Sequence, residues 1–304
     1  MKRIGVDIGG SHIGVGLVEE SYIIAKKERD IAEEDKERIQ EFIITTIVNA
    51  VTDLLKENNV EIQEIEKLGI SGPGTIKNNL WIYSNNLKID NFDICSKLKE
   101  YFSIPIYIKN DAKCAGLAEK VYGGLKEYSD GIFICLGTGF GSAVFLGGKL
   151  LESKTYPGFE LGHIIIQKDG KQCTCGQRGC IETYCSMKRL KASIIEAFDL
   201  NPNISGEDLQ IYVRSHLQDT KLEGIFEEFI KNLSIGLSSI INIFEPEIIC
   251  LGGSFAYYED ILLDRLINYI RQNDLLFNHN DKERIKIEIA KFKNDAGIIG
   301  ASVI

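Results

Sequence analysis

The stretch that decides the fold is residues 3–18, which read RIGVDIGGSHIGVGLV. A strand of alternating apolar and small residues ends in the turn Gly9-Gly10-Ser11, and a second strand follows at once. Residues 131–146 repeat this plan as GIFICLGTGFGSAVFL, with a glycine turn at residues 137–141. Neither turn opens a helix, as the glycine fingerprint of dinucleotide-binding proteins does. The duplicated strand–turn–strand plan predicts an α/β protein of two related lobes that face a cleft.

The boundaries of the two lobes follow from the periodicity of the remaining elements. Strands are expected at 22–25, 67–70, 104–108 and 247–251, and helices at 35–58, 112–121, 222–244 and 295–303. We expect a small N-terminal lobe over residues 1–115, joined by the C-terminal helix at about 293–304, with Asn294 or Asp295 as its cap. The large lobe spans residues 116–292 and carries a cysteine-rich loop at 163–180.

Composition and charge limit the classes of function. The chain has 304 residues, 44% apolar and 26% charged, as expected of an ordinary globular protein. Its net charge of −9 argues against a nucleic-acid or anionic-membrane partner. No apolar run approaches the roughly 20 residues of a membrane span, and the N-terminal residues lack the features of a signal peptide. Eight cysteines without a secretory signal predict a reducing, cytoplasmic location.

One imidazole and three thiols lie close together in the chain at His163, Cys173, Cys175 and Cys180. This set suits tetrahedral zinc, which thiolates and a neutral imidazole bind at about 2.0–2.3 Å. Because all four ligands come from the protein, the predicted zinc site is closed and structural. Other interpretations stay open: the cysteines only pack or form a disulfide, or Cys185 replaces one ligand.

Two carboxylates bracket these ligands. Glu160 comes just before His163, and Glu182 comes just after Cys180. The metal does not need them, which predicts that they are substrate ligands held in place by the zinc loop. His163 could serve both purposes, with one ring nitrogen for zinc and the other for substrate.

Three glycine-rich turns each follow a strand: Gly9-Gly10-Ser11, Gly137-Thr138-Gly139 and Gly252-Gly253. Glycine lets backbone N–H groups approach phosphate oxygens closely, so we expect these turns to bind phosphate. Asp7 lies just before the first turn, where its carboxylate could hold Mg²⁺ directly or through water. The chain has no Walker A lysine motif.

Asn110-Asp111 lies at a strand end, immediately before a helix. Such loop positions often carry chemistry. One interpretation is that Asp111 only caps the helix. The other is that it takes the proton of a hydroxyl that attacks a γ-phosphate. The two roles are compatible, and Asn110, Glu160 and Glu182 would offer acceptors for vicinal hydroxyls.

The order of these motifs resembles the ROK family of sugar kinases, and its bacterial glucokinases in particular. The matching motifs are Asp7-Ile8-Gly9-Gly10-Ser11, Gly72-Pro73-Gly74, Asn110-Asp111, Leu136-Gly137-Thr138-Gly139, Glu160-Leu161-Gly162-His163, the run from Cys173 to Glu182, and Leu251-Gly252-Gly253. The resemblance runs from the first residues to the last helix. It implies a two-lobed actin-like ATPase fold, a ribonuclease H-like duplication, together with ATP, Mg²⁺ and a structural Zn²⁺.

The resemblance also implies roles for single residues. Asp111 would be the catalytic base, and zinc would be held by His163, Cys173, Cys175 and Cys180. The hexose would be bound by Gly72, Asn86, Asn110, Asp111, Glu160, His163 and Glu182. ATP would be bound by Asp7, Gly9, Gly10, Ser11, Gly137, Thr138, Gly139, Gly252 and Gly253.

Two positions depart from the family pattern. Ser11-His12 replaces a common Thr-Lys pair, so a fixed positive charge is lost at His12. Asn85-Asn86-Leu87 replaces the Pro-Asn-Leu of many family glucokinases. The identity of the sugar is therefore less constrained than the reaction.

The expected function is ATP-dependent phosphorylation of the 6-hydroxyl of a hexose, with glucose as the first choice. N-acetylmannosamine, allose or fructose are alternative substrates, and a non-catalytic sugar sensor is the alternative from another class. Repressors of the family carry a helix-turn-helix ahead of the first glycine turn, whereas the first strand here is expected from about residue 3. We expect a homodimer or higher homo-oligomer, with no nucleic-acid or membrane partner.

Overall fold

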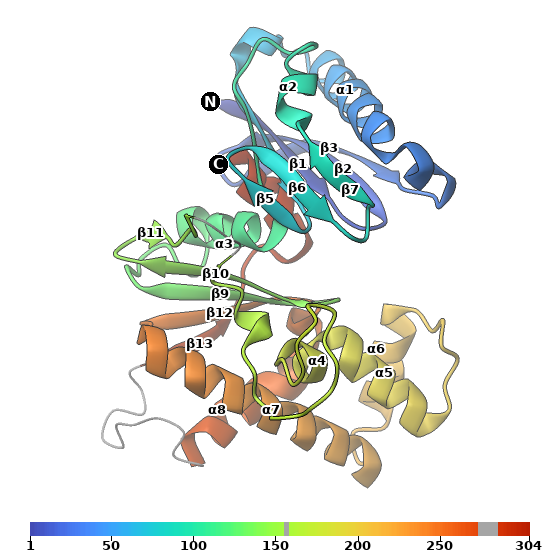
Figure 1. The fold of residues 1–304 in the computed structure, drawn as a ribbon, viewed down its shortest axis with the longest axis vertical. Coiled ribbons are helices and arrows are strands. Elements are labelled where there is room, and N and C mark those ends of the chain that lie inside the picture. Colours follow the sequence, from blue (N-terminus) through green and yellow to red (C-terminus); the bar gives the residue numbers. More distant parts are fainter. Residues whose placement is uncertain (155–157, 273–284) are drawn as a thin grey trace. The chain divides into compact units, whose positions relative to one another are not determined.

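The computed structural model describes residues 1–154, 158–272 and 285–304, and the chain divides into two compact units (Figure 1). Unit 1 contains Met1–Lys126 and Asn294–Ile304, with a short segment that starts at Ser153. Unit 2 contains Glu127–Glu152 and Gly158–Lys293. Each unit buries an apolar core of its own.

Unit 1 is built on a five-stranded sheet of order β3-β2-β1-β4-β8. The strands β1 (Lys2–Ile8), β2 (His12–Glu19) and β3 (Tyr22–Asp30) are antiparallel neighbours. β4 (Ile65–Gly72) runs parallel to β1, and β8 (Ile106–Asn110) runs parallel to β4. The expected strand–turn–strand opening is confirmed.

One long helix covers the first face of this sheet. The helix expected at 35–58 begins as a 3₁₀ turn, η1 (Glu34–Arg38), and continues as α1 (Ile39–Glu57). Its apolar stripe, which includes Ile43, Ile47 and Val51, is fully buried with the side chains of β1 and β2. This is the amphipathic packing that the 3.6-residue period of the sequence predicts.

The C-terminal helix α9 (Ala296–Ser302) packs on the other face of the same sheet, beside α3 (Asp111–Tyr122). A Cβ on Gly5 would lie 2.0 Å from the carbonyl oxygen of Ile298. A Cβ on Gly69 would lie 1.8 Å from that of Ala301. Only glycine allows this approach, so α9 is an integral part of unit 1.

A second, three-stranded sheet in unit 1 was not expected from the sequence. It consists of β5 (Thr75–Lys77), β6 (Leu80–Ser84) and β7 (Ile89–Phe92), with η2 (Ile62–Glu64) earlier in the chain and α2 (Ile94–Leu98) after it. Trp81 of β6 is fully buried, and its Nε1 donates to the carbonyl oxygen of Pro73 at 2.9 Å. This bond ties the small sheet to the turn that follows β4.

Unit 2 repeats the topology of the large sheet of unit 1. Its sheet has the order β11-β10-β9-β12-β13. The strands β9 (Gly131–Leu136), β10 (Phe140–Leu146) and β11 (Lys149–Leu150) are antiparallel neighbours. β12 (Ile248–Gly253) and β13 (Lys286–Ile289) are parallel additions, as β4 and β8 are in unit 1. The duplicated α/β fold is confirmed.

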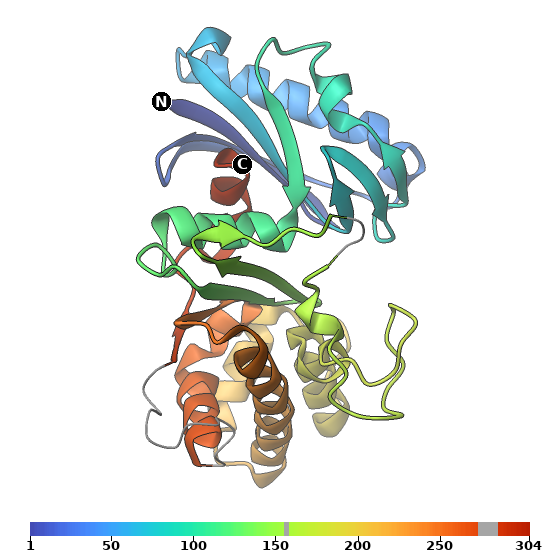
Figure 2. The same cartoon turned by 60° about the vertical axis from the view of Figure 1, so that its left-hand side comes forward.

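Helices of unit 2 gather on one face of its sheet, as Figure 2 shows for the long α7 and for α8. They are α4 (Glu182–Cys185), α5 (Met187–Phe198), α6 (Gly206–Ser215), α7 (Thr220–Phe244) and α8 (Glu259–Gln272), and unit 2 also has the 3₁₀ turns η3 (Leu161–His163) and η4 (Ser254–Tyr258). The 3₁₀ turn η5 (Lys293–Asp295) leads from unit 2 into unit 1. Asp219 caps α7 by accepting from two backbone N–H groups, and the helix ends at Glu245 in a left-handed conformation. Among the described residues, no helix is long and apolar enough to cross a membrane.

Two boundaries and one helix cap differ from the sequence-based expectation. The lobe boundary expected near residue 115 lies inside α3, which belongs wholly to unit 1 because it packs on α9. The strand expected at 104–108 runs from Ile106 to Asn110, where Gly72 of β4 pairs with Asn110. Asp295 takes the N-cap position of α9 without a side-chain cap hydrogen bond, and its Oδ1 accepts from Lys26 at 3.4 Å.

Candidate functional site

The four predicted zinc ligands meet in unit 2. The ligand atoms of His163, Cys173, Cys175 and Cys180 all lie within 4.8 Å of one another. Nδ1 of His163 is 3.7 Å from Sγ of Cys173, and the Sγ atoms of Cys175 and Cys180 are 3.6 Å apart. Tetrahedral bonds of about 2.3 Å imply sulfur–sulfur separations of about 3.8 Å. The geometry therefore fits a zinc ion.

The loop reaches this geometry through two glycines. Gly176 and Gly179 have φ of +92° and +83°, a region that disfavours other residues. The N–H of Cys173 donates to the carbonyl oxygen of Gln177 at 2.8 Å, which closes the loop between the sulfurs. A Cβ on Gly179 would lie 1.8 Å from the carbonyl oxygen of Gln167, so the loop folds back tightly.

The Cys180 thiol resists ionisation in the metal-free cluster. Burial, together with the neighbouring Cys175 and Cys173 thiols, raises the pKa of the Cys180 thiol to about 12. A bound zinc ion reverses this effect because it stabilises thiolates. The sulfurs of Cys175 and Cys180 are too far apart for a disulfide, which needs about 2.05 Å. Cys185 is outside the cluster, buried in the apolar core of unit 2.

Glu182 lies at the start of α4, immediately after the zinc loop. Its Oε2 accepts a 2.9 Å hydrogen bond from the backbone N–H of Phe140, in the glycine turn between β9 and β10. One carboxylate oxygen is thus bound to the turn. The structure brings a predicted sugar ligand into contact with a predicted phosphate turn.

Glu160 lies in the segment that leads into η3, and a buried serine holds the backbone on both sides of it. Oγ of Ser142 donates to the carbonyl oxygen of Phe159 at 2.8 Å and accepts from the N–H of Leu161 at 3.3 Å. Phe159 has a φ of +62°, so the chain turns sharply just before Glu160. Ser142 was not predicted, because a serine within an apolar strand gives no specific signal.

The two glycine segments of unit 2, residues 137–139 and 252–253, are neighbours. Gly252 and Gly253 pair with Cys135 and Leu136 at the end of β9, immediately before the turn at 137–139. Gly253 has a φ of +68°, and a Cβ there would lie 2.6 Å from the carbonyl oxygen of Leu136. Both predicted phosphate segments of unit 2 therefore lie at one edge of its sheet.

In unit 1 the helix cap beside Asp111 is Asn110. Its Oδ1 accepts from the N–H groups of Ala112 and Lys113 at 3.1 and 3.3 Å, and its Nδ2 donates to the carbonyl oxygen of Gly74 at 3.1 Å. The interpretation of Asp111 as the cap is wrong. Because its oxygen is used for capping, Asn110 has an N–H donor to offer to a ligand instead of the expected acceptor.

Asp111 is the first residue of α3, and Oδ1 accepts from the N–H of Ala112 at 2.8 Å. This bond orients the carboxylate at the end of β8. Asp7 lies at the corresponding end of β1, and both carboxylates raise the pKa of the buried Cys114 thiol beyond the effect of burial itself. The structure thus brings Asp7 and Asp111 to the same edge of the sheet, the carboxyl edge at which such sheets bind ligands.

The turn after β1 is closed by a 2.8 Å hydrogen bond from the N–H of Gly9 to the carbonyl oxygen of His12. Ser11 accepts from the N–H of Ile31 at 2.8 Å through its own carbonyl oxygen. Gly10 faces open space, and a Cβ on Gly9 would lie 3.0 Å from Cε1 of the His12 ring. The imidazole therefore lies against the turn, where the family pattern has a lysine.

Two predicted sugar ligands lie near the small sheet. Gly72 pairs with Asn110, and a Cβ on it would lie 3.1 Å from the Trp81 ring. Asn86 is exposed in the turn between β6 and β7. Gly72 therefore lies beside the cap of α3, and Asn86 lies on a surface turn.

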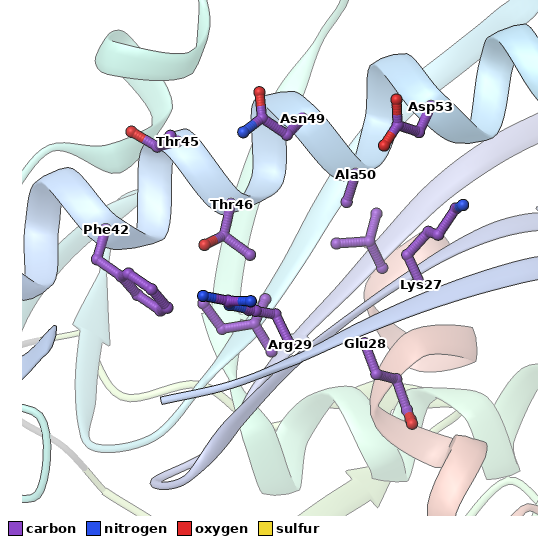
Figure 3. A pocket seen from close by; sticks show the side chains of 11 residues that line it. Lys27, Glu28, Arg29, Phe42, Thr45, Thr46, Asn49, Ala50 and Asp53 are labelled. Carbon is purple, nitrogen blue, oxygen red and sulfur yellow. The ribbon is translucent and has the colours of Figure 1, made fainter. Parts of the chain in front are cut away.

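A separate groove of about 440 Å³ runs between α1 and the strands β2 and β3 (Figure 3). Arg29, Thr46 and Phe42 point toward it, and Ile13 and Val15 are among its apolar lining residues. None of the side chains predicted for substrate, cofactor or metal lines this groove. It is distinct from the candidate site.

A sequence model described as the ROK family matches residues 3–304. The chain belongs to the ROK family. A glucokinase of Thermotoga maritima is 29% identical over 324 residues, which cover 100% of this ROK protein and 97% of that enzyme. A xylose repressor of Caldicellulosiruptor bescii is 27% identical over 315 residues, which cover 98% of this chain and 76% of the repressor.

Among solved structures, a ROK hexokinase from Thermus thermophilus is similar with a TM-score of 0.81 and 26% identity. The similarity covers 100% of this ROK protein and 97% of that chain. The actin-like ATPase fold that the motif order implies is confirmed by this likeness together with the duplicated sheet topology.

Proposed function

We propose that this ROK protein is an ATP-dependent hexokinase that phosphorylates the 6-hydroxyl of glucose. The observation that carries the proposal is the carboxylate of Asp111 at the carboxyl edge of the sheet, oriented by Ala112 N–H and near Cys114, as the half-buried Asp7 also is. A carboxylate so placed suits proton removal from an attacking hydroxyl. The similarity to a glucokinase and a hexokinase along the whole chain supports phosphoryl transfer.

In the proposed reaction, Asp111 aligns the 6-hydroxyl and takes its proton as the oxygen attacks the γ-phosphorus of ATP. The bond from this phosphorus to the bridging oxygen of the β-phosphate breaks, and ADP leaves. N–H groups of the glycine turns stabilise the charge on the transferring phosphoryl group. Asp7 would hold Mg²⁺, which when bound neutralises charge on the β- and γ-phosphates. Glu160 and Glu182 would accept from sugar hydroxyls and hold the ring in a reactive orientation.

The zinc ion has no chemical step in this proposal. Its four ligands fill the tetrahedral shell, which leaves no position for water or substrate. With Nδ1 of His163 facing Cys173, the opposite ring nitrogen is left to donate to a sugar hydroxyl.

The experiment is a panel of glucose, N-acetylmannosamine, allose and fructose with ATP, compared by kcat/KM. Glucose should give the highest value. A higher value for another sugar would replace glucose as the substrate and keep the reaction. The Asp111→Asn variant serves as the background for each sugar.

A sugar-binding regulator without catalysis is the second candidate, because a xylose repressor is 27% identical over 98% of this chain. It predicts sugar binding with no phosphoryl transfer to any sugar of the panel. Calorimetric binding of sugar without turnover would favour it over the kinase.

A further inference from the structure

The carboxylate of Glu182 is in direct contact with the glycine turn at residues 137–141. Besides the 2.9 Å bond from the N–H of Phe140 to Oε2, a Cβ built on Gly139 would lie 2.6 Å from the same oxygen. The turn therefore passes close to the carboxylate because residue 139 has no side chain. All of these groups belong to unit 2.

The segment that follows Glu182 also holds the first residue of the turn, Gly137. The N–H of Lys188 donates to the carbonyl oxygen of Gly137 at 3.1 Å. The turn is thus held at Phe140 by the Glu182 side chain and at Gly137 by the backbone near the start of α5.

The zinc loop and this contact are joined by one buried residue. Cys180 and Ile181 are both fully buried, and Glu182 follows. A Cβ on Gly236 of α7 would lie 2.0 Å from Cδ1 of Ile181, so this residue is tightly packed. Because Ile181 is tightly packed, a displacement of Cys180 should also displace the carboxylate of Glu182.

We propose that Glu182 is a positioning residue that couples the zinc loop and its sugar site to the phosphate turn. Oε2 fixes the turn, which leaves Oε1 to accept from a sugar hydroxyl. Sugar and zinc both order the carboxylate, so each raises the affinity of the turn for ATP phosphates, and ATP raises the affinity for sugar by the same factor. This inference rests on the proposed function, since it assigns the sugar to the zinc loop and the nucleotide to the glycine turn.

Two alanine substitutions in unit 2 test the coupling. Gly139→Ala places a methyl group close to Oε2 and displaces the carboxylate, which is the flexible end of its side chain. Gly224→Ala in α7 is the control, because a Cβ there meets nothing within 4 Å and the residue lies outside the predicted binding residues. The readout is the sugar dissociation constant measured without nucleotide. Gly139→Ala should raise it by about fivefold or more, a typical coupling factor. Gly224→Ala should change it by less than about twofold on the same scale.

Equal sugar dissociation constants in the two variants would overturn the proposal. They would show that the contact only packs the turn against α4. A larger loss of sugar affinity in Gly224→Ala than in Gly139→Ala would overturn it as well.

Hydrogen exchange of the Phe140 amide provides a readout that needs no substrate. In zinc-loaded, full-length protein, Glu182→Ala should speed the exchange of this amide by about tenfold, because an opening free energy lower by 1.4 kcal/mol corresponds to that factor. Glu182→Gln keeps an acceptor oxygen and should retain the protection. Removal of zinc from the wild type should act in the same direction as Glu182→Ala. Unchanged exchange in Glu182→Ala would refute the coupling.

The two failures are distinguishable. If no sugar is phosphorylated but Phe140 protection depends on Glu182 and zinc, the proposed reaction falls and the structural coupling stands. If glucose is phosphorylated while exchange and sugar affinity are unaffected in the variants, the coupling falls and the reaction stands.

Discussion

The hydroxyl of Ser71 donates a 2.7 Å hydrogen bond to Oδ1 of Asp7 between the neighbouring strands β4 and β1. The carboxylate also lies against α9, since a Cβ on Gly297 would be 2.4 Å from either of its oxygens. Burial raises the pKa of Asp7, and the Ser71 bond and the nearby His12 only partly oppose this shift. Ionisation of Asp7 therefore costs free energy in the ligand-free protein. A bound cation would offset this cost, as expected if Asp7 holds Mg²⁺.

Asp7→Asn should therefore raise the melting temperature of the ligand-free protein at neutral pH while it lowers activity. The pKa of Asp7 is higher in the folded than in the unfolded state. The contribution of Asp7 to folding stability is therefore most favourable below the unfolded pKa, and it becomes less favourable as pH rises through the folded pKa. The advantage of the asparagine variant should be larger at pH 7 than at pH 4. Each 1 kcal/mol of this advantage should raise the melting temperature by about 2–4 °C. Thermal unfolding at both pH values measures it. A variant no more stable than wild type at pH 7 would contradict it.

Gly297→Ala should destabilise unit 1, because its methyl group would overlap the half-buried Asp7 carboxylate, which the Ser71 hydrogen bond holds in place. We expect a loss of about 1–3 kcal/mol, as for other overpacked sites. Gly224→Ala in α7 is the control, since a Cβ there meets nothing within 4 Å. It should stabilise by about 0.5–1 kcal/mol, because alanine favours helix. Denaturant unfolding compares the two, and similar effects would refute the crowding at Asp7.

Much of the site was predictable because its chemistry is visible in short spacings. The zinc ligands fall within one loop, and Asp7 and Asp111 each follow an apolar strand. The partners that hold these groups were not predictable. Ser71 is 64 residues from Asp7, and Ser142 acts on a backbone 17 residues away, so neither leaves a local pattern.

The fold shows the same division. The long periodic α1 and α7 and the repeated glycine turns were visible in the sequence, because a buried face repeats at fixed intervals. The small sheet β5-β6-β7 was missed because its strands have only three to five residues and lie between asparagine and glycine turns. The role of Asn110 as the cap could not be separated from that of Asp111, since both residue types favour helix starts.

Asp111→Asn should lower kcat by about 10²–10⁴-fold, because an amide keeps the shape but cannot take the proton. Sugar binding should stay within about tenfold, since at most one hydrogen bond to the sugar is weakened. Stability should change by less than about 0.5 kcal/mol, because Asn110 still caps α3. Steady-state kinetics, sugar titration and thermal unfolding check the three parts. Retention of most of the wild-type kcat would show that Asp111 is not the base.

Ser142→Ala should raise the KM for sugar more than the KM for ATP, as Glu160→Gln should. The hydroxyl holds the backbone before and after Glu160, so its loss frees the carboxylate from its orientation. We expect an increase of about tenfold for Glu160→Gln, from the loss of a charge-assisted hydrogen bond, and a smaller one for Ser142→Ala.

The control for this serine is Ser234→Ala in α7. The Ser234 hydroxyl is buried without a hydrogen-bond partner among the residues that the structure describes. Its removal should leave both KM values unchanged and cost no stability. If Ser142→Ala and Ser234→Ala behave alike, Ser142 does not position Glu160.

Zinc should act through structure, so its loss should lower sugar affinity and thermal stability together. Metal analysis of the purified protein should give one zinc ion for each cluster of His163, Cys173, Cys175 and Cys180. Chelation or Cys175→Ala should release it, because metal binding and folding of such loops are linked. Cys185→Ala is the matched control: this thiol is buried outside the cluster, so the variant should keep its zinc and lose only about 1 kcal/mol for a small cavity. A zinc-free preparation with full sugar affinity and an unchanged melting temperature would remove the metal from this explanation, and loss of zinc in Cys185→Ala would reassign the fourth ligand.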